Sequence, residues 1–102
     1  MQLMMPVQEL GFIECKTFSI AANSSKAFSV PARSKVRFMG IGIATAIFDM
    51  ITLTQVSGAV NVAEIYKGSS ITHSETSGTF TVSNASGGAV NVYAYVFEGS
   101  VS

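Results

Sequence analysis

Hydrophobic and polar residues alternate along much of this chain with a period of two, which predicts β-strands rather than helices. The clearest pattern is in residues 80–97, FTVSNASGGAVNVYAYVF, where two alternating segments flank the turn-forming residues 84–88. We predict a β-hairpin here. Its second strand has two apolar faces, one with Val90, Val92, Ala94 and Val96 and the other with Tyr93, Tyr95 and Phe97. Because a solvated sheet face is usually polar, the aromatic face is predicted to be covered by something.

Shorter alternating segments fill the rest of the chain, separated by clusters of Gly, Ser, Asn or Pro. Residues 18–31, FSIAANSSKAFSVP, predict a second hairpin around the turn cluster 21–25. In residues 36–44 the apolar parity changes at Gly40, which predicts a β-bulge there. The pattern gives about eight short strands in all, and no segment of useful length has a helical period.

The pentapeptide Gly-Ala-Val-Asn-Val occurs twice, at residues 58–62 and 88–92. The surrounding segments 51–69 and 80–100 also resemble each other, so we interpret them as two similar hairpins, with convergence on turn chemistry as the alternative to duplication. The predicted fold is all-β: a single antiparallel β-sandwich, jelly-roll-like. An immunoglobulin-like sandwich is the second choice, because the chain lacks its usual cysteine pair and tryptophan.

We expect an apolar N-terminal arm at residues 1–8, followed by the sandwich domain at residues 9–102. The flexible apolar side chains of the arm suit contact with a neighbouring subunit, and an edge strand folded onto its own core is an equal alternative. They are Met1, Leu3, Met4 and Met5. The segment MQLMMPV lacks the features of a signal peptide, and the longest nearly uncharged run, 38–48, is too short for a membrane span.

Charged residues make up only 12% of the chain, about half the usual share, while 48% of residues are apolar. The mean hydropathy of +0.43 is high for a soluble monomer, so we predict that apolar surface is covered by partner subunits. Formal net charge is zero, which gives no reason to expect nucleic-acid binding. The single cysteine, Cys15, is predicted to be a buried strand residue.

Candidate chemistry is sparse. His73 and Glu75 share one strand face without an evident third ligand, so a histidine in a solvated loop is favoured over a metal site. Asp49 shares its parity with large aliphatic residues, and we favour a structural carboxylate bonded to backbone N–H groups or to a Lys or Arg over a site acid. No catalytic motif is present, and no spacing selects a pair among the carboxylates. We therefore expect neither an enzyme nor a cofactor or metal site.

The tyrosines admit two interpretations. Tyr66, Tyr93 and Tyr95 could stack on sugars, which would make the chain a carbohydrate-binding or host-receptor adhesion module. Alternatively, Tyr93, Tyr95 and Phe97 lie at a subunit interface, where aromatic residues are enriched. The low charge and the apolar N-terminus favour the interface.

The segment TFTVSNASGGAVNVYAYVFEG, residues 79–99, with its Asn-containing turn and aromatic closing strand, resembles small bacteriophage virion proteins. Members of this group include capsid decoration proteins and the trimeric tips of head or tail fibres. The resemblance implies a structural virion component, assembled in the host cytoplasm as a homo-oligomer, with a trimer favoured, and bound to other virion proteins. The resemblance identifies no functional residue in this chain.

Overall fold

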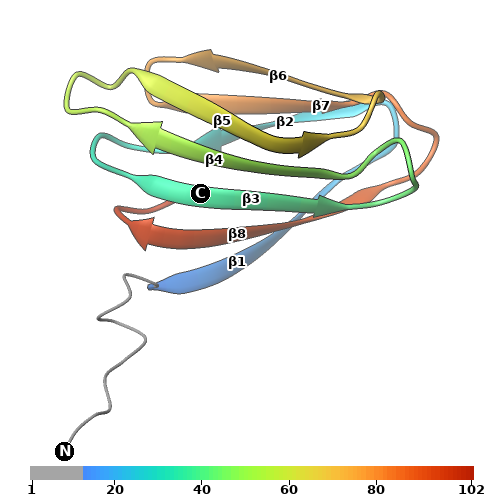
Figure 1. The fold of residues 1–102 in the computed structure, drawn as a ribbon, viewed down its shortest axis with the longest axis horizontal. Coiled ribbons are helices and arrows are strands. Elements are labelled where there is room, and N and C mark those ends of the chain that lie inside the picture. Colours follow the sequence, from blue (N-terminus) through green and yellow to red (C-terminus); the bar gives the residue numbers. More distant parts are fainter. Residues whose placement is uncertain (1–12) are drawn as a thin grey trace, which may run out of the picture.

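The structure, a computed structural model, describes residues 13–102 as two stacked antiparallel β-sheets (Figure 1). The larger sheet has the strand order β1-β8-β3-β4-β5 and the smaller sheet the order β2-β7-β6. The strands are β1 (Glu14–Ile20), β2 (Ser24–Ser29), β3 (Lys35–Ile41), β4 (Phe48–Thr54), β5 (Val60–Lys67), β6 (Ile71–Thr76), β7 (Thr79–Asn84) and β8 (Val90–Glu98). Among the described residues no helix is long and apolar enough to span a membrane.

This architecture confirms the predicted antiparallel β-sandwich of eight strands. Its pairing is nested, because β1 pairs with β8 in one sheet while β2 pairs with β7 in the other. Such wrapping of the chain's two halves around each other is jelly-roll-like. The strands divide five and three because β4 and β5 extend the larger sheet as a consecutive hairpin.

The core lies between the sheets and is built from phenylalanine rings of both. Phe28 of β2 and Phe80 of β7 come from the smaller sheet, and Phe38 of β3 comes from the larger one. The centroid of the Phe38 ring lies 4.8 Å from that of Phe28 and 5.0 Å from that of Phe80. These ring contacts join the two sheets directly, with the rings tilted and not stacked face to face.

One of the two predicted copies of the repeat is a hairpin. Strands β4 and β5 pair with each other, and the loop between them is closed by hydrogen bonds from Gln55 N to Ala59 O and from Gly58 N to Gln55 O. Gly58 has a φ of +95°, a left-handed conformation that glycine adopts without strain. The hairpin predicted for this segment is confirmed.

The hairpin predicted at residues 80–97 is wrong, because β7 and β8 lie in different sheets. Asn84, buried at the end of β7, donates from Nδ2 to the carbonyls of Ile20 at 3.3 Å and Ala21 at 3.2 Å. Its Oδ1 accepts from the backbone N of Ser86 at 3.0 Å. These bonds tie the loop to the end of β1, so the chain crosses the sandwich and β8 pairs with β1.

The hairpin predicted at residues 18–31 is wrong for the same topological reason. Strand β1 belongs to the larger sheet and β2 to the smaller one, so the turn between them is also a crossing. Asn23 takes a φ of +54° in this turn, a conformation that asparagine tolerates better than most residues. Turn-forming residues therefore mark the corner without specifying which strand the chain joins next.

The bulge predicted at Gly40 is also absent from β3. Gly40 pairs in regular register with Phe48 and Val92, while the register shifts lie between Asp49 and Met50 and between Lys35 and Val36. A Cβ atom at position 40 would lie 2.1 Å from Cε2 of Phe48, so glycine leaves the space that this ring occupies. Ile41, instead of turning inward, is 55% exposed.

Candidate interaction face and edge cluster

The first candidate site is the face of the larger sheet that points away from the smaller sheet, which we call the outer face. In β8, half-buried Tyr93 and Tyr95 alternate with residues that are completely buried. The structure therefore shows the predicted alternation in β8, with valine and alanine on the buried side and the aromatic residues on the half-buried side. Phe97 is also half-buried and lies at the register shift, where Lys35 pairs with Glu98 and Val36 with Val96.

The strand register continues this apolar character across the sheet. Tyr93 pairs with Met39 of β3, and Ile51 of β4 pairs with Ala63 of β5. Leu53 of β4 is 48% exposed. Together the apolar members of the outer face are Met39, Ile41, Ile51, Leu53, Ala63, Tyr66, Tyr93 and Tyr95. A depression of about 370 Å³ indents one end of this face, with Ile51, Leu53 and Ala63 in its lining and Lys35 and Glu98 beside them.

Asp49 lies on the outer face and forms a two-pronged ion pair with Arg37 of the neighbouring strand. The Nε atom of Arg37 donates to Oδ1 at 2.9 Å, and its Nη2 atom donates to Oδ2 at 2.6 Å. The hydrogen bond with Asp49 outweighs partial burial and raises the pKa of Arg37. The favoured interpretation of Asp49 as a structural carboxylate paired with a basic side chain is confirmed.

The three tyrosines do not gather into one platform. Tyr66 of β5 is 55% exposed and pairs with Asp49, while Tyr93 and Tyr95 lie on β8. Three strand spacings separate β5 from β8, which amounts to about 14 Å. The structure brings Tyr93 and Tyr95 together on one strand and leaves Tyr66 on the far edge. Met1, Leu3, Met4 and Met5 lie outside the described residues.

The second candidate site is an ionic cluster where the edge strands β5 and β6 meet. His73 of β6 contacts Glu75 of the same strand through Nδ1, and Glu64 of β5 through Nε2 at 2.5 Å. The histidine side chain is only 16% exposed, so the predicted solvated loop is wrong: His73 is a strand residue turned partly inward. Burial of the ring lowers its pKa, but the hydrogen bonds to Glu75 and Glu64 more than offset this, so the pKa of His73 is raised.

The sequence predicts only two of the three members of this cluster, His73 and Glu75. The shared parity of His73 and Glu75 was visible, but Glu64 lies nine residues earlier, on the other sheet. The two ring nitrogens point at different carboxylates, an arrangement that leaves no common point for a bound ion. Within residues 13–102 no group of three His, Cys, Asp or Glu side chains is placed to hold a metal.

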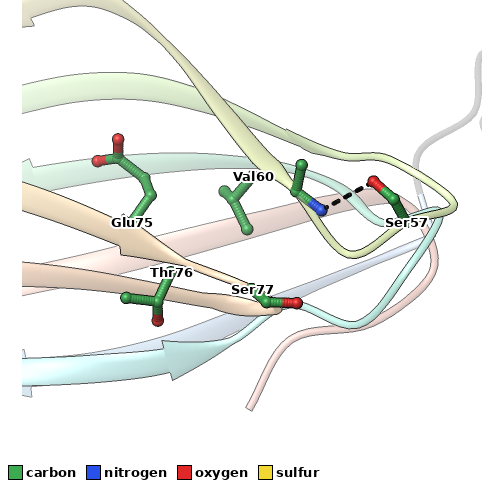
Figure 2. A pocket seen from close by; sticks show the side chains of 6 residues that line it. Ser57, Val60, Glu75, Thr76 and Ser77 are labelled. Carbon is green, nitrogen blue, oxygen red and sulfur yellow. Dashed lines mark hydrogen bonds between the residues drawn. The ribbon is translucent and has the colours of Figure 1, made fainter.

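Beside the cluster, a shallow groove of about 380 Å³ opens between the β4–β5 loop and the β6–β7 turn (Figure 2). Glu75 forms part of its wall, and the hydroxyl-bearing side chains of Ser57, Thr76 and Ser77 line it with Val60. The loop and the turn are joined by a backbone hydrogen bond from Gly78 N to Gly58 O at 2.8 Å. The groove therefore spans the edges of both sheets, with hydroxyl groups and the Glu75 carboxylate among its lining.

The remaining singled-out residue, Cys15, is an exposed residue of β1, so its predicted burial is wrong. It pairs with Tyr95 at the edge of the larger sheet. Paired residues share a sheet face, so Cys15 lies on the outer face with Tyr95, where the smaller sheet does not cover it.

No protein family model matches the chain, and no curated protein matches it. Among solved structures, the chain is similar to the tailspike protein gp49 of Acinetobacter baumannii bacteriophage Fri1, a capsular polysaccharide depolymerase. The similarity has a TM-score of 0.62 at 13% sequence identity, and it covers 96% of this chain and 23% of the tailspike chain. At this identity the likeness is one of fold, and this fold therefore also occurs as part of a bacteriophage tail protein.

Proposed function

We propose that this chain is a non-enzymatic structural component of a bacteriophage virion that assembles with copies of itself through the outer face. The observation that carries the proposal is the set of apolar side chains exposed on that face, from Ile41 near one end of the sheet to Leu53 near the other, with Tyr66 on β5. Several large apolar side chains exposed on one sheet face are typical of interaction sites in soluble proteins. The similarity in fold to part of a tailspike supports the virion setting.

The size of the outer face suits a subunit contact. Five strands about 4.8 Å apart, each rising about 3.3 Å per residue over about seven residues, give a face of about 550 Å² per subunit. Two such faces in contact would bury about 1,100 Å², just above the threshold of about 1,000 Å² for a specific interface. The area is therefore sufficient for self-association without further contacts.

The charges on this face favour a second copy as its occupant. Arg37 and Asp49 neutralise each other within one subunit, so covering them leaves no unpaired charge. Lys35 and Glu98 carry opposite charges beside the apolar depression, which makes this end of the face self-complementary. Two identical faces that meet in this way form a twofold dimer, whereas the resemblance to fibre tips implies a trimer. In either form, the proposed role is that of a capsid decoration or fibre subunit.

The molar mass in solution tests this proposal. Size-exclusion chromatography with light scattering at micromolar concentration is expected to give an oligomer. Its mass would be twice the 10.7 kDa of the chain if outer faces meet in pairs, or three times if the trimer implied by the resemblance forms. Leu53→Lys should weaken association at least tenfold, because an ammonium group would have to be desolvated in the contact. Ile43→Lys is the matched control, since Ile43 is similarly exposed at 51% but lies in the β3–β4 loop. A monomeric wild type, or equal behaviour of the two variants, would contradict the proposal.

A second function, carbohydrate binding, is favoured by one observation: the neighbour in fold acts on a capsular polysaccharide. In this proposal Tyr93 and Tyr95 supply a stacking surface and Tyr66 a separate one. A glycan array should then give binding that Tyr93→Ala removes while Tyr66→Ala leaves it partly intact. Absence of binding across a broad array would count against this function and would leave the assembly proposal untouched.

A further inference from the structure

The Glu64–His73–Glu75 cluster joins the edges of the two sheets. Strand β5 is the last strand of the larger sheet and β6 the last of the smaller one, and residues 68–70 connect them. His73 contacts Glu75 on its own strand and Glu64 across the gap between the sheets. The centroid of its ring also lies 5.8 Å from that of Phe80, at the border of the core. The imidazole therefore links the two layers at the surface of the core.

The chemistry of this arrangement depends on the charge of the ring. A neutral imidazole has one N–H donor and one nitrogen lone pair, whereas the protonated ring donates from both nitrogens. Both nitrogens of His73 face carboxylate oxygens, which only accept hydrogen bonds when ionised. With a neutral ring, one nitrogen lone pair would face a carboxylate oxygen. Only the protonated ring satisfies both contacts.

We propose that Glu64, His73 and Glu75 form a pH-sensitive clasp that holds strand β5 against strand β6 when His73 is protonated and loosens when His73 loses its proton. Loss of the proton removes one of the two donors and leaves two carboxylates near each other without the intervening positive charge. The neutral ring has one N–H donor for two carboxylates, so the contact between the sheets, from His73 to Glu64, is weakened.

The other ionisable groups near the clasp do not replace this charge. On β5, Lys67 is committed to the backbone, because its Nζ donates to the carbonyl of Ile71 at 3.0 Å. On β7, the neighbours of His73 are Val82 and Phe80, neither of which titrates. Strand β4 contributes Met50, the pairing partner of Glu64. The charged groups that face His73 are thus its two carboxylate partners.

The direction of the pH effect follows from the raised pKa of His73. A group whose pKa is higher in the folded than in the unfolded state stabilises the fold fully below its ordinary pKa, about 6.5 for histidine. This stabilisation is lost as the pH rises through the higher value. The clasp is therefore closed in mildly acidic solution and opens toward alkaline pH.

The clasp also affects the neighbouring groove, because Glu75 contacts His73 and also lines the groove. Figure 2 shows Glu75 in the groove lining. While the clasp is closed, the ring of His73 fixes the Glu75 carboxylate at the groove wall. When it opens, this carboxylate is released and the wall of the groove loses its support. The shape of the groove is thus predicted to change over the same pH range as the ring.

The chain contains one histidine, so the state of the ring can be followed by NMR without ambiguity. We expect His73 to titrate above 6.5, with both nitrogens protonated at mildly acidic pH. Glu64→Gln and Glu75→Gln should each lower the pKa of His73, whereas Glu98→Gln, an exposed residue at the end of β8, should not. A ring that titrates at or below 6.5, or that responds equally to all three variants, would overturn the proposal.

Urea unfolding at about pH 6 and about pH 8, where histidine is the principal titrating side chain, tests the effect on the fold. The unfolding equilibrium constant of the wild type should increase several-fold at the higher pH, while that of His73→Gln should change little. The same pH dependence in both proteins would refute the clasp. If His73→Gln does not fold, Glu64→Gln provides the comparison, since it keeps the ring but removes the negative charge that the ring meets across the two sheets.

Discussion

Replacing Gly40 by alanine is predicted to destabilise the sandwich through a single methyl group. Gly40 is buried near the end of β3, opposite Phe48 of β4. A Cβ atom there would lie 2.1, 2.5 and 2.7 Å from three atoms of the Phe48 ring. Because Phe48 is only 2% exposed and belongs to the core, its ring has no free space into which it can withdraw.

The size of the effect follows from two opposing contributions. Adding a methylene-sized group to a well-packed core typically costs about 1–3 kcal/mol, and a clash with three ring atoms belongs at the upper end of this range. Replacing glycine by alanine also restricts the unfolded chain, which stabilises the fold by about 0.4–1 kcal/mol. The net loss is about 2 kcal/mol, equivalent to a fall in Tm of about 8–16 °C for a domain of this size.

Urea and thermal unfolding of four variants, Gly40→Ala, Gly87→Ala, Phe48→Leu and Gly40→Ala/Phe48→Leu, measure this effect. Gly87→Ala is the matched control, because a Cβ atom at position 87 has no heavy atom within 4 Å. The double variant Gly40→Ala/Phe48→Leu should be more stable than the sum of its single changes, since the smaller side chain removes the ring that the new methyl group meets. Equal stability of Gly40→Ala and Gly87→Ala, or strict additivity in the double variant, would refute this account of Gly40.

Two further predictions concern buried polar side chains. Within the described part of the chain, Thr54 Oγ1 is buried without a hydrogen-bond partner, so Thr54→Val should stabilise the fold by up to about 1 kcal/mol. Thr52→Val should not stabilise the fold, because Thr52 Oγ1 donates to a backbone carbonyl at 3.2 Å. Urea unfolding of both variants compares their stabilities, and a loss of stability in Thr54→Val would contradict the prediction. Asn84→Ala should lower stability by at least about 2 kcal/mol, since several buried partners lose their hydrogen bonds. Exposed Asn91→Ala is its control, and equal melting temperatures of the two variants would contradict the role of Asn84.

The sequence pattern predicts the strands of this protein well, because the alternation of residues within each strand indicates which of its faces is buried. Along β8 the alternation of valine and alanine with aromatic residues corresponds directly to buried and half-buried positions. In β4 the same alternation places Phe48 and Met50 inward, and Asp49 with its aliphatic neighbours outward. The apparent conflict of a carboxylate among aliphatic residues disappears, since that face is open enough for Asp49 to meet Arg37.

The connections between strands could not be predicted in the same way. The pentapeptide Gly-Ala-Val-Asn-Val begins within a hairpin loop at residues 58–62 and within a crossing between sheets at residues 88–92. Both loops contain five residues between their flanking strands. They differ because Asn84 bonds to carbonyls 63 and 64 residues earlier in the chain. This information is long-range, and no local turn signal contains it.

The edge cluster illustrates a third case, in which the pattern is present but its meaning depends on a neighbour. Ile71, His73 and Glu75 share one parity on β6, and the first of them is completely buried. This periodicity indicates that His73 also turns inward, in spite of the polar residues around it. The partner that fixes its charge, Glu64, becomes adjacent only when the two sheets stack.

The two candidate sites respond differently to solution conditions because their positive charges differ in kind. The guanidinium of Arg37 keeps its charge at any pH in which the protein is folded, so the ion pair on the outer face presents the same surface throughout. The imidazole of His73 changes its charge near neutrality, and it lies at the edge where β5 meets β6 rather than on the outer face. Assembly through the outer face is therefore separable from opening of the clasp. A pH-dependent loss of stability with an unchanged oligomeric state would place the effect at the edge, whereas loss of the oligomer alone would place it on the outer face.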